Sequence, residues 1–166
     1  MKMGNTLPCR KPLRADFHDY SGGDYFVTIC TQGKRHYFGE IFNGTMHLNA
    51  IGVFVDNEME RLLRHYRYVE VPLWVVMPNH VHAVIRICGN DAADNLSHAQ
   101  CCRQALGVVV GGMKRAVTIF AKSNGFEFGW QGRFHDHIIR GTDDGDRIAD
   151  YIRHNVVRWD TDCYNT

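Results

Sequence analysis

The sequence lacks several features that mark specialised protein classes. It has no run of about 18 consecutive apolar residues, the length that a transmembrane helix needs. Residues 1–14 lack the apolar stretch of a secretory signal. The six cysteines include no Cys-x-x-Cys pair, and two of them are adjacent, which is poor geometry for a disulfide framework. We therefore expect a cytoplasmic protein with reduced thiols and no membrane contact.

The sequence also has little net charge. The formal value of +1 is far from the strongly basic balance that is common in nucleic-acid-binding proteins. The distribution is less even, because residues 1–15 and 95–126 contain basic side chains and no acid. These two segments predict either local patches that bind phosphates or simply solvated faces.

The 166 residues suit one domain, residues 1–166, and contain no repeat or low-complexity tract. Apolar periodicity and turn residues predict strands at 25–31, around the turn Asn43-Gly44 within 37–48, in a hairpin at 71–87 and at 128–140. Helices are expected at 50–67 after an Asn49 cap, at 106–122 and at 143–159, with a loop at 89–99. This order predicts an α+β fold of the ferredoxin-like kind, with helices packed on an antiparallel sheet.

The most informative motif is His80-Val81-His82, at the start of the second strand of the hairpin. Residues at i and i+2 of a strand point to the same side and lie roughly 7 Å apart. Both imidazoles can therefore reach one cation, and the motif predicts a metal site that needs further ligands.

The last predicted helix carries a tyrosine outside its apolar face. Tyr151 shares a flank with Arg147, Asn155 and Arg158, and Asn155 lies one turn further along. A tyrosine on the rim of the core is the simplest explanation. The alternative is a nucleophile, because a metal held by two histidines would polarise a phosphate for attack by the phenol. Asn155 would then be a third metal ligand.

Three motifs together resemble one family, the single-tyrosine HUH transposases and their REP-associated relatives. The motifs are Trp74-Val75-Val76-Met77-Pro78-Asn79-His80-Val81-His82, Trp130-Gln131-Gly132-Arg133-Phe134-His135-Asp136-His137 and Asp150-Tyr151-Ile152-Arg153-His154-Asn155. Their order and spacing and the chain length agree with the family. One departure is Val156, where many relatives have a proline.

The resemblance implies a ferredoxin-like enzyme that cleaves and rejoins single-stranded DNA, often beside a hairpin. It implies that Tyr151 attacks the scissile phosphate to leave a 5′-phosphotyrosyl enzyme and a free 3′-hydroxyl. His80 and His82 would bind Mg²⁺ or Mn²⁺, with Asn155 at the position of a third ligand. Lookalikes include both monomers and homodimers with exchanged C-terminal helices, so the tyrosine is expected to act either in cis or in trans.

A second His-x-His, formed by His135 and His137, ranks lower as a metal pair because the intervening residue is Asp136 rather than a buried anchor. His137 is a candidate for a supporting role near the site. The candidate nucleic-acid contacts are basic residues on the predicted acid-free helix and near the proposed site: Lys114, Arg115, Arg133, Arg147, Arg153 and Arg158.

Two hypotheses follow. The first is a metal-dependent DNA strand transferase that uses Tyr151. The second is a non-catalytic module on the same fold that recognises hairpin DNA or RNA. They differ in whether the two histidines and the tyrosine hydroxyl converge, and we expect that they do.

Overall fold

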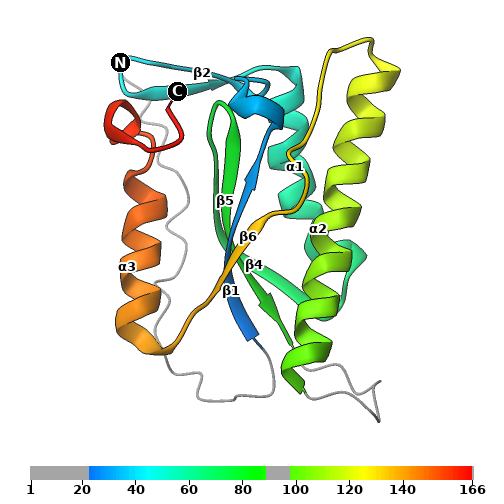
Figure 1. Ribbon diagram of the computed structural model, residues 1–166, viewed down its shortest axis with the longest axis vertical. Coiled ribbons are helices and arrows are strands. Elements are labelled where there is room, and N and C mark those ends of the chain that lie inside the picture. Colours follow the sequence, from blue (N-terminus) through cyan, green and yellow to red (C-terminus); the bar gives the residue numbers. More distant parts are fainter. Residues whose placement is uncertain (1–22, 89–97, 166) are drawn as a thin grey trace, which may run out of the picture.

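The computed structural model describes residues 23–88 and 98–165 (Figure 1). The basic segment 1–15 and most of the predicted loop 89–99 lie outside the described residues. The elements are β1 (Gly23–Cys30), the 3-10 turn η1 (Gln32–Lys34), β2 (Gly39–Phe42), β3 (Thr45–Leu48), α1 (Ala50–His65), β4 (Val69–Val76), β5 (His80–Ile87), α2 (His98–Ser123), β6 (His135–Ile138), α3 (Gly141–His154) and the 3-10 turn η2 (Trp159–Thr161).

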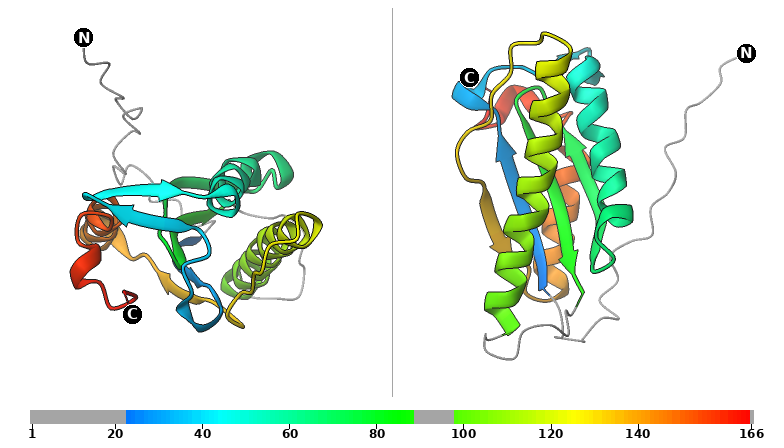
Figure 2. Two further views of the ribbon diagram at one scale, coloured as in Figure 1. Left: turned by 90° about the horizontal axis from the view of Figure 1, so that it is seen from above. Right: turned by 90° about the vertical axis from the view of Figure 1, so that its right-hand side faces the viewer.

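Four strands form one sheet in the order β4-β5-β1-β6, and every neighbouring pair is antiparallel. The helices α1 and α2 cover one face of this sheet, and α3 covers the other (Figures 1 and 2). The β2–β3 hairpin forms a separate two-stranded sheet. The fold is the ferredoxin-like α+β sandwich that the sequence predicts.

The alternation of strand side chains divides the core into two layers. Val27, Val81 and Ile85 belong to a large apolar cluster that includes residues of α1 and α2. On the other face, Val84 packs in a smaller cluster with Ile152 and other apolar residues of α3. The histidines of β5 alternate with Val81, so the strand period places them on the α3 side.

Local sequence features predict the start of α1 and the turn between β2 and β3 correctly. Asn49 caps α1, because its side-chain oxygen accepts hydrogen bonds from the backbone N–H groups of Ile51 and Gly52, each at 3.0 Å. The hairpin turn has φ values of 51° at Asn43 and 69° at Gly44, the left-handed region that this residue pair tolerates. The predicted helix start and turn are therefore confirmed.

Three predicted elements have the wrong bounds. The helix α2 begins at His98 rather than at residue 106. The last strand covers only His135–Ile138 rather than 128–140, because Arg133 has a φ of 67° and interrupts the extended backbone. The last helix is Gly141–His154 rather than 143–159, and the chain then turns so that Trp159 is buried.

No helix in residues 23–88 and 98–165 is long and apolar enough to cross a bilayer.

The glycines in α2 are tolerated, and one of them permits a close approach. A Cβ on Gly112 would lie 2.5 Å from the hydroxyl oxygen of Tyr66, so the side chain of Tyr66 occupies the space that glycine leaves.

We predict that Asn49→Ala lowers the free energy of unfolding by about 1 kcal/mol, because two N–H groups of α1 lose their acceptor. Urea unfolding followed by circular dichroism measures the change. Asn57→Ala, at an exposed position of the same helix, is the control and should cost less. An equal loss in both variants would show that the cap contributes nothing specific.

Candidate active site

The two histidines of β5 form the centre of a polar cluster beneath α3. His80 and His82 are 0% and 1% exposed, and their ring centroids lie 4.4 Å apart. Both rings lie on the side of the sheet that α3 covers, while Val81 between them is part of the larger core. The expected projection of both imidazoles from one face is confirmed.

The side chain of Asn79 determines the tautomer of His80. Its amide nitrogen Nδ2 donates to the backbone oxygens of Lys34 at 3.0 Å and Tyr164 at 2.8 Å. The amide oxygen Oδ1 therefore faces Nδ1 of His80, at 2.8 Å. Because Oδ1 only accepts hydrogen bonds, Nδ1 carries the proton, and the lone pair of His80 is on Nε2. That Nε2 is buried and has no hydrogen-bond partner among residues 23–88 and 98–165.

His82 is held on both sides of its ring. Its Nδ1 lies 2.9 Å from Thr28 Oγ1 on the neighbouring strand, where Thr28 and His82 are paired in register. Its Nε2 lies 3.2 Å from the hydroxyl oxygen of Tyr151. The ring of Phe26 stacks on the imidazole with a centroid distance of 5.2 Å. The orientation of His82 is therefore fixed by the sheet before any ligand binds.

Burial keeps both imidazoles neutral. Desolvation lowers the pKa of His80 from 6.5 to about 4. Desolvation, with a smaller effect from His80, also lowers the pKa of His82 well below 6.5. Neutral imidazole is the protonation state that binds a metal ion. The pair is thus in its ligating form at neutral pH.

The helix α3 brings Tyr151 to the histidines. Ile148, Ala149 and Ile152 anchor α3 to the sheet through the smaller apolar cluster, and Tyr151 packs at its edge. The phenol ring lies edge-on to Phe26 at 6.1 Å. Burial, followed by the charge of Asp162, raises the pKa of Tyr151 from 10 to about 12. The expected convergence of tyrosine hydroxyl and histidine is therefore observed, and it occurs within one chain.

Asn155 follows the last residue of α3 and is completely buried. Its Nδ2 donates to Asp162 Oδ2 at 2.8 Å. Its Oδ1 has no hydrogen-bond partner in the part of the chain that the structure describes. An amide oxygen that is buried without a donor is available to a cation, which is the role expected for Asn155.

Asp162 also belongs to the site, although no sequence motif predicted it. This residue follows η2, where the chain folds back over the site, and its Oδ2 also accepts from the Tyr151 hydroxyl at 3.4 Å. One ligand atom each from His80, His82 and Asp162 lie within 4.8 Å of one another. Because the helix was predicted to continue to residue 159, the turn that brings Asp162 to the site was not expected. The only local indication of a site residue there is an acid shortly after a large aromatic residue, Trp159.

These residues fit a divalent metal ion. Two buried atoms with free lone pairs, His80 Nε2 and Asn155 Oδ1, belong to the cluster that contains the carboxylate of Asp162. An unpartnered buried acceptor costs free energy unless something binds it. Imidazole nitrogen with amide and carboxylate oxygen is a common donor set for divalent transition metals.

The C-terminal residues also line the site. The ring of Tyr164 lies 4.5 Å from that of His80 and 5.7 Å from that of His82. Its backbone N–H donates to Asp162 Oδ1 at 2.8 Å. Two tyrosines, Tyr151 and Tyr164, therefore flank the histidine pair.

The predicted nucleic-acid contacts are distributed over two faces. Lys114 and Arg115 belong to α2, on the face of the sheet opposite α3. The ammonium of Lys114 donates to the backbone oxygens of Gln131 at 2.7 Å and Arg133 at 3.0 Å, and it lies over the ring of Trp130. Lys114 therefore contributes to holding the segment before β6, whereas the side chain of Arg115 is exposed.

The three arginines on or next to α3 are exposed. Arg147 pairs with Asp144 at 3.3 Å, and Arg158 lies 3.8 Å from Asp150. Arg153 is also exposed, as is Arg133 in the turn before β6. Tyr151, the proposed nucleophile, belongs to the same helix as Arg147 and Arg153.

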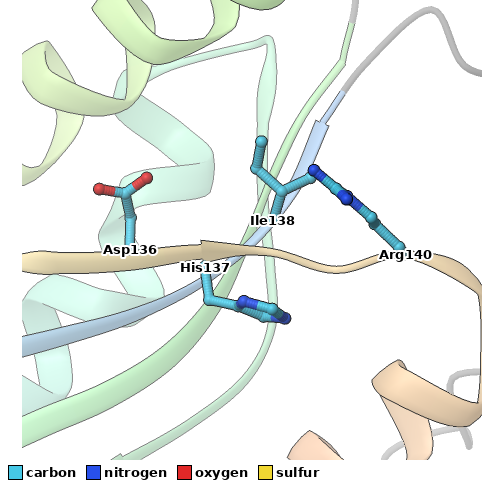
Figure 3. Close-up of a pocket in the computed structure, with 4 residues that line it drawn as sticks. All are labelled: Asp136, His137, Ile138 and Arg140. Atoms are coloured by element: carbon cyan, nitrogen blue, oxygen red, sulfur yellow. The ribbon is translucent and has the colours of Figure 1, made fainter.

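The second His-x-His lies elsewhere. His137 pairs with Phe26 across the sheet, and its Nε2 lies 2.8 Å from Asp144 Oδ2. An open hollow beside β6 is lined by Asp136, His137, Ile138 and Arg140, with Asp136 and His137 on opposite sides of the strand (Figure 3). His137 contacts the first turn of α3 rather than the buried histidine pair.

The chain is similar in sequence to one known protein and in fold to a solved structure. No family model matches the sequence. The chain is 32% identical over 164 residues to a protein of Haemophilus influenzae described as uncharacterised, and the match covers 92% of this chain and 91% of the relative. The chain belongs to the same family as that protein.

One similar solved structure is that of a REP-associated tyrosine transposase bound to a REP hairpin. It superposes with a TM-score of 0.54 and 21% sequence identity, over 82% of this chain and 68% of that chain. At this identity the likeness establishes a shared fold.

The buried histidines predict a specific pH dependence of stability in metal-free protein. The unfolded chain protonates these groups near pH 6.5, whereas the pKa of His80 in the folded protein is about 4. The stability that the neutral rings contribute is therefore complete above about pH 6.5 and is lost as the pH falls toward 4. We expect the free energy of unfolding in EDTA to decline over this range. Urea titrations at several pH values measure the decline.

His80→Gln should flatten this pH dependence, whatever its effect on stability at neutral pH. His47→Gln, at an exposed position of β3, is the matched control and should keep the wild-type slope. If His80→Gln leaves the slope of unfolding free energy against pH unchanged, the lowered pKa of His80 is contradicted.

Proposed function

We propose that this member of the family is a metal-dependent enzyme of the single-tyrosine HUH transposase type, which cleaves and rejoins single-stranded DNA next to a hairpin. The observation that carries the proposal is the Tyr151 hydroxyl 3.2 Å from His82 Nε2, beside the two unpartnered ligand atoms of His80 and Asn155. The resemblance of the three sequence motifs and the shared fold support it.

His80, His82, Asn155 and Asp162 would hold the metal, a divalent ion such as Mn²⁺ or Mg²⁺. When bound, the ion polarises a phosphate and stabilises negative charge in the transition state. The protein fixes the ligands in advance, through Asn79 on His80 and Thr28 on His82. This pre-organisation reduces the rearrangement needed at the moment of reaction.

Tyr151 is the proposed nucleophile. Its oxygen forms a bond to phosphorus while the bond from phosphorus to the 3′-oxygen breaks, which leaves a 5′-phosphotyrosyl enzyme and a 3′-hydroxyl after protonation. Asp162 Oδ2, at 3.4 Å, is positioned to accept the phenol proton. In the reverse direction a 3′-hydroxyl attacks the phosphotyrosine, and Tyr151 regains its proton.

The nucleic-acid contacts are proposed on the side of α3. Arg147, Arg153 and Arg158 are exposed on or next to the helix that carries Tyr151, so they are placed to bind phosphates of the strand being cut. Arg115 and Arg133 remain proposed contacts for a more distant part of the hairpin. One chain supplies Tyr151 and both histidines, so an exchange of helices between subunits is not required for this site.

The proposal predicts that Mn²⁺ stabilises the protein. At a concentration of about 100 times the Kd, the ion should raise the melting temperature by roughly 5–10 °C, a shift measured by differential scanning fluorimetry and checked by electron paramagnetic resonance of free Mn²⁺. His80→Ala and His82→Ala should abolish the shift, and Asp162→Asn should reduce it. His137→Ala is the matched control, and loss of the shift in that variant would move the metal site to β6.

The proposal also predicts a covalent adduct that depends on Tyr151. Incubation with end-labelled single-stranded hairpin DNA and Mn²⁺ or Mg²⁺ should give a denaturation-resistant complex of protein and DNA. Tyr151→Phe should abolish the complex, whereas Tyr164→Phe, at the other tyrosine beside the histidines, should retain it.

An adduct that survives Tyr151→Phe would overturn the nucleophile assignment. Binding of hairpins without an adduct, across a broad set of oligonucleotides, would instead favour the non-catalytic binding module.

A further inference from the structure

Lys34 lies at the rim of the histidine cluster, outside the motifs that predicted the site. Cys30 at the end of β1 pairs with His80 at the start of β5, so the η1 turn that follows β1 begins beside the histidines. The backbone oxygen of Lys34 accepts the 3.0 Å hydrogen bond from Asn79 Nδ2. The amide that fixes the tautomer of His80 therefore also fixes the position of Lys34.

The side chain of Lys34 extends over the C-terminal residues. Its Nζ donates to the backbone oxygen of Cys163 at 3.0 Å and lies 5.5 Å from the ring centroid of Tyr164. The Tyr164 ring in turn lies 4.5 Å from that of His80. Burial is the main cause of the lowered pKa of His80, and the positive charge of Lys34 adds a smaller contribution in the same direction.

The backbone of Lys34 is unusual for a residue with a side chain. Its φ is 53°, directly after Gly33 with a φ of 61°. Left-handed conformations of this kind are uncommon outside glycine, asparagine and aspartate. Such conformations cluster at functional sites when the surrounding structure maintains them.

Lys34 differs in its partners from three arginines near the site. Arg35 pairs with Glu127, Arg147 with Asp144, and Arg158 lies near Asp150. Among residues 23–88 and 98–165, no carboxylate lies within ion-pair distance of Lys34, and its side-chain acceptor is a neutral carbonyl. Its charge is therefore available to an anion.

We propose that Lys34 binds a phosphate group of the DNA single strand, next to the phosphate that Tyr151 attacks. This inference rests on the proposed function and adds a phosphate subsite to it. On binding, Nζ exchanges the carbonyl of Cys163 for an anionic oxygen, which gives a stronger, charge-assisted hydrogen bond. The compact ammonium suits a phosphate as a point charge and carries no sequence preference.

The salt dependence of binding tests the proposal. In a Tyr151→Phe background, which prevents cleavage, fluorescence anisotropy gives the Kd of a labelled single-stranded hairpin oligonucleotide at several salt concentrations. One lost phosphate contact should reduce the slope of log K against log [salt] by about 0.7 in Lys34→Gln. Arg35→Gln, the adjacent exposed residue with the same charge change, is the matched control and should keep the slope.

A methylphosphonate scan locates the contact. Each oligonucleotide in the set has one phosphate replaced by a neutral methylphosphonate. At one position near the cleavage site, the replacement should weaken binding about tenfold in the Tyr151→Phe protein and leave binding to Lys34→Gln unchanged. This expectation corresponds to the loss of one hydrogen bond to a charged group.

Two further variants distinguish the loss of a phosphate contact from a folding defect. Lys34→Gly suits the positive φ and should fold normally while it loses the same salt slope. Lys34→Arg should retain the slope. The Mn²⁺-induced thermal shift should persist in all Lys34 variants, because Lys34 is not a ligand.

The outcomes separate the two proposals. An unchanged slope in both Lys34→Gln and Lys34→Gly, an equal loss in Arg35→Gln, or a methylphosphonate effect that persists without Lys34 would overturn the phosphate subsite. If the protein with Tyr151 forms an adduct in that case, the proposed function stands. If that protein forms no adduct and binds no single strand, the proposed function fails, and the subsite with it.

Discussion

The site depends on the side chain of Asn79, a buried amide at the turn between β4 and β5. All of its polar atoms have partners: Oδ1 faces His80, and Nδ2 donates to the backbone of Lys34 and of Tyr164. Its backbone oxygen accepts from the backbone N–H and the hydroxyl of Thr31. One residue thus connects the end of β1, the histidine strand and the C-terminal residues. An aspartate has the same shape but no N–H, so it could not hold the two carbonyls and the ring together.

The second constraint is the burial of the histidine face under α3. In a sandwich with helices on one side only, the histidines would lie in water and titrate near their ordinary pKa. The packing of Val84 against Ile152 instead brings α3 down on that face, removes water from the rings and lowers the pKa of both histidines. The same packing places Tyr151 within hydrogen-bonding distance of His82. The neutral state of the two histidines and the position of Tyr151 therefore have one structural cause.

Features that follow from local periodicity could be predicted from the sequence. The alternation around Val81 places His80 and His82 on one face, and Asn49 signals the start of α1 by its capping chemistry. The course of the chain after α3 could not be predicted in this way. Its turn buries Trp159 against the rings of His36 and His80, which are tertiary contacts without a local signal. Asp162 reaches the site through this turn, and Lys34 is held there by the pairing of β1 with β5 and by a hydrogen bond to a residue 45 positions away.

The two unpartnered atoms of the site, His80 Nε2 and Asn155 Oδ1, lower the free energy of unfolding. A buried acceptor without a donor destabilises a fold by about 1–3 kcal/mol, and a methyl-bearing side chain of similar size would avoid this loss. Both atoms belong to side chains whose other polar groups are fixed, His80 by Asn79 and Asn155 by Asp162. Neither side chain can therefore rotate to find a partner without breaking an existing hydrogen bond. The structure holds two lone pairs beside a carboxylate and a tyrosine, an arrangement that stability alone would not favour and that a bound cation would offset.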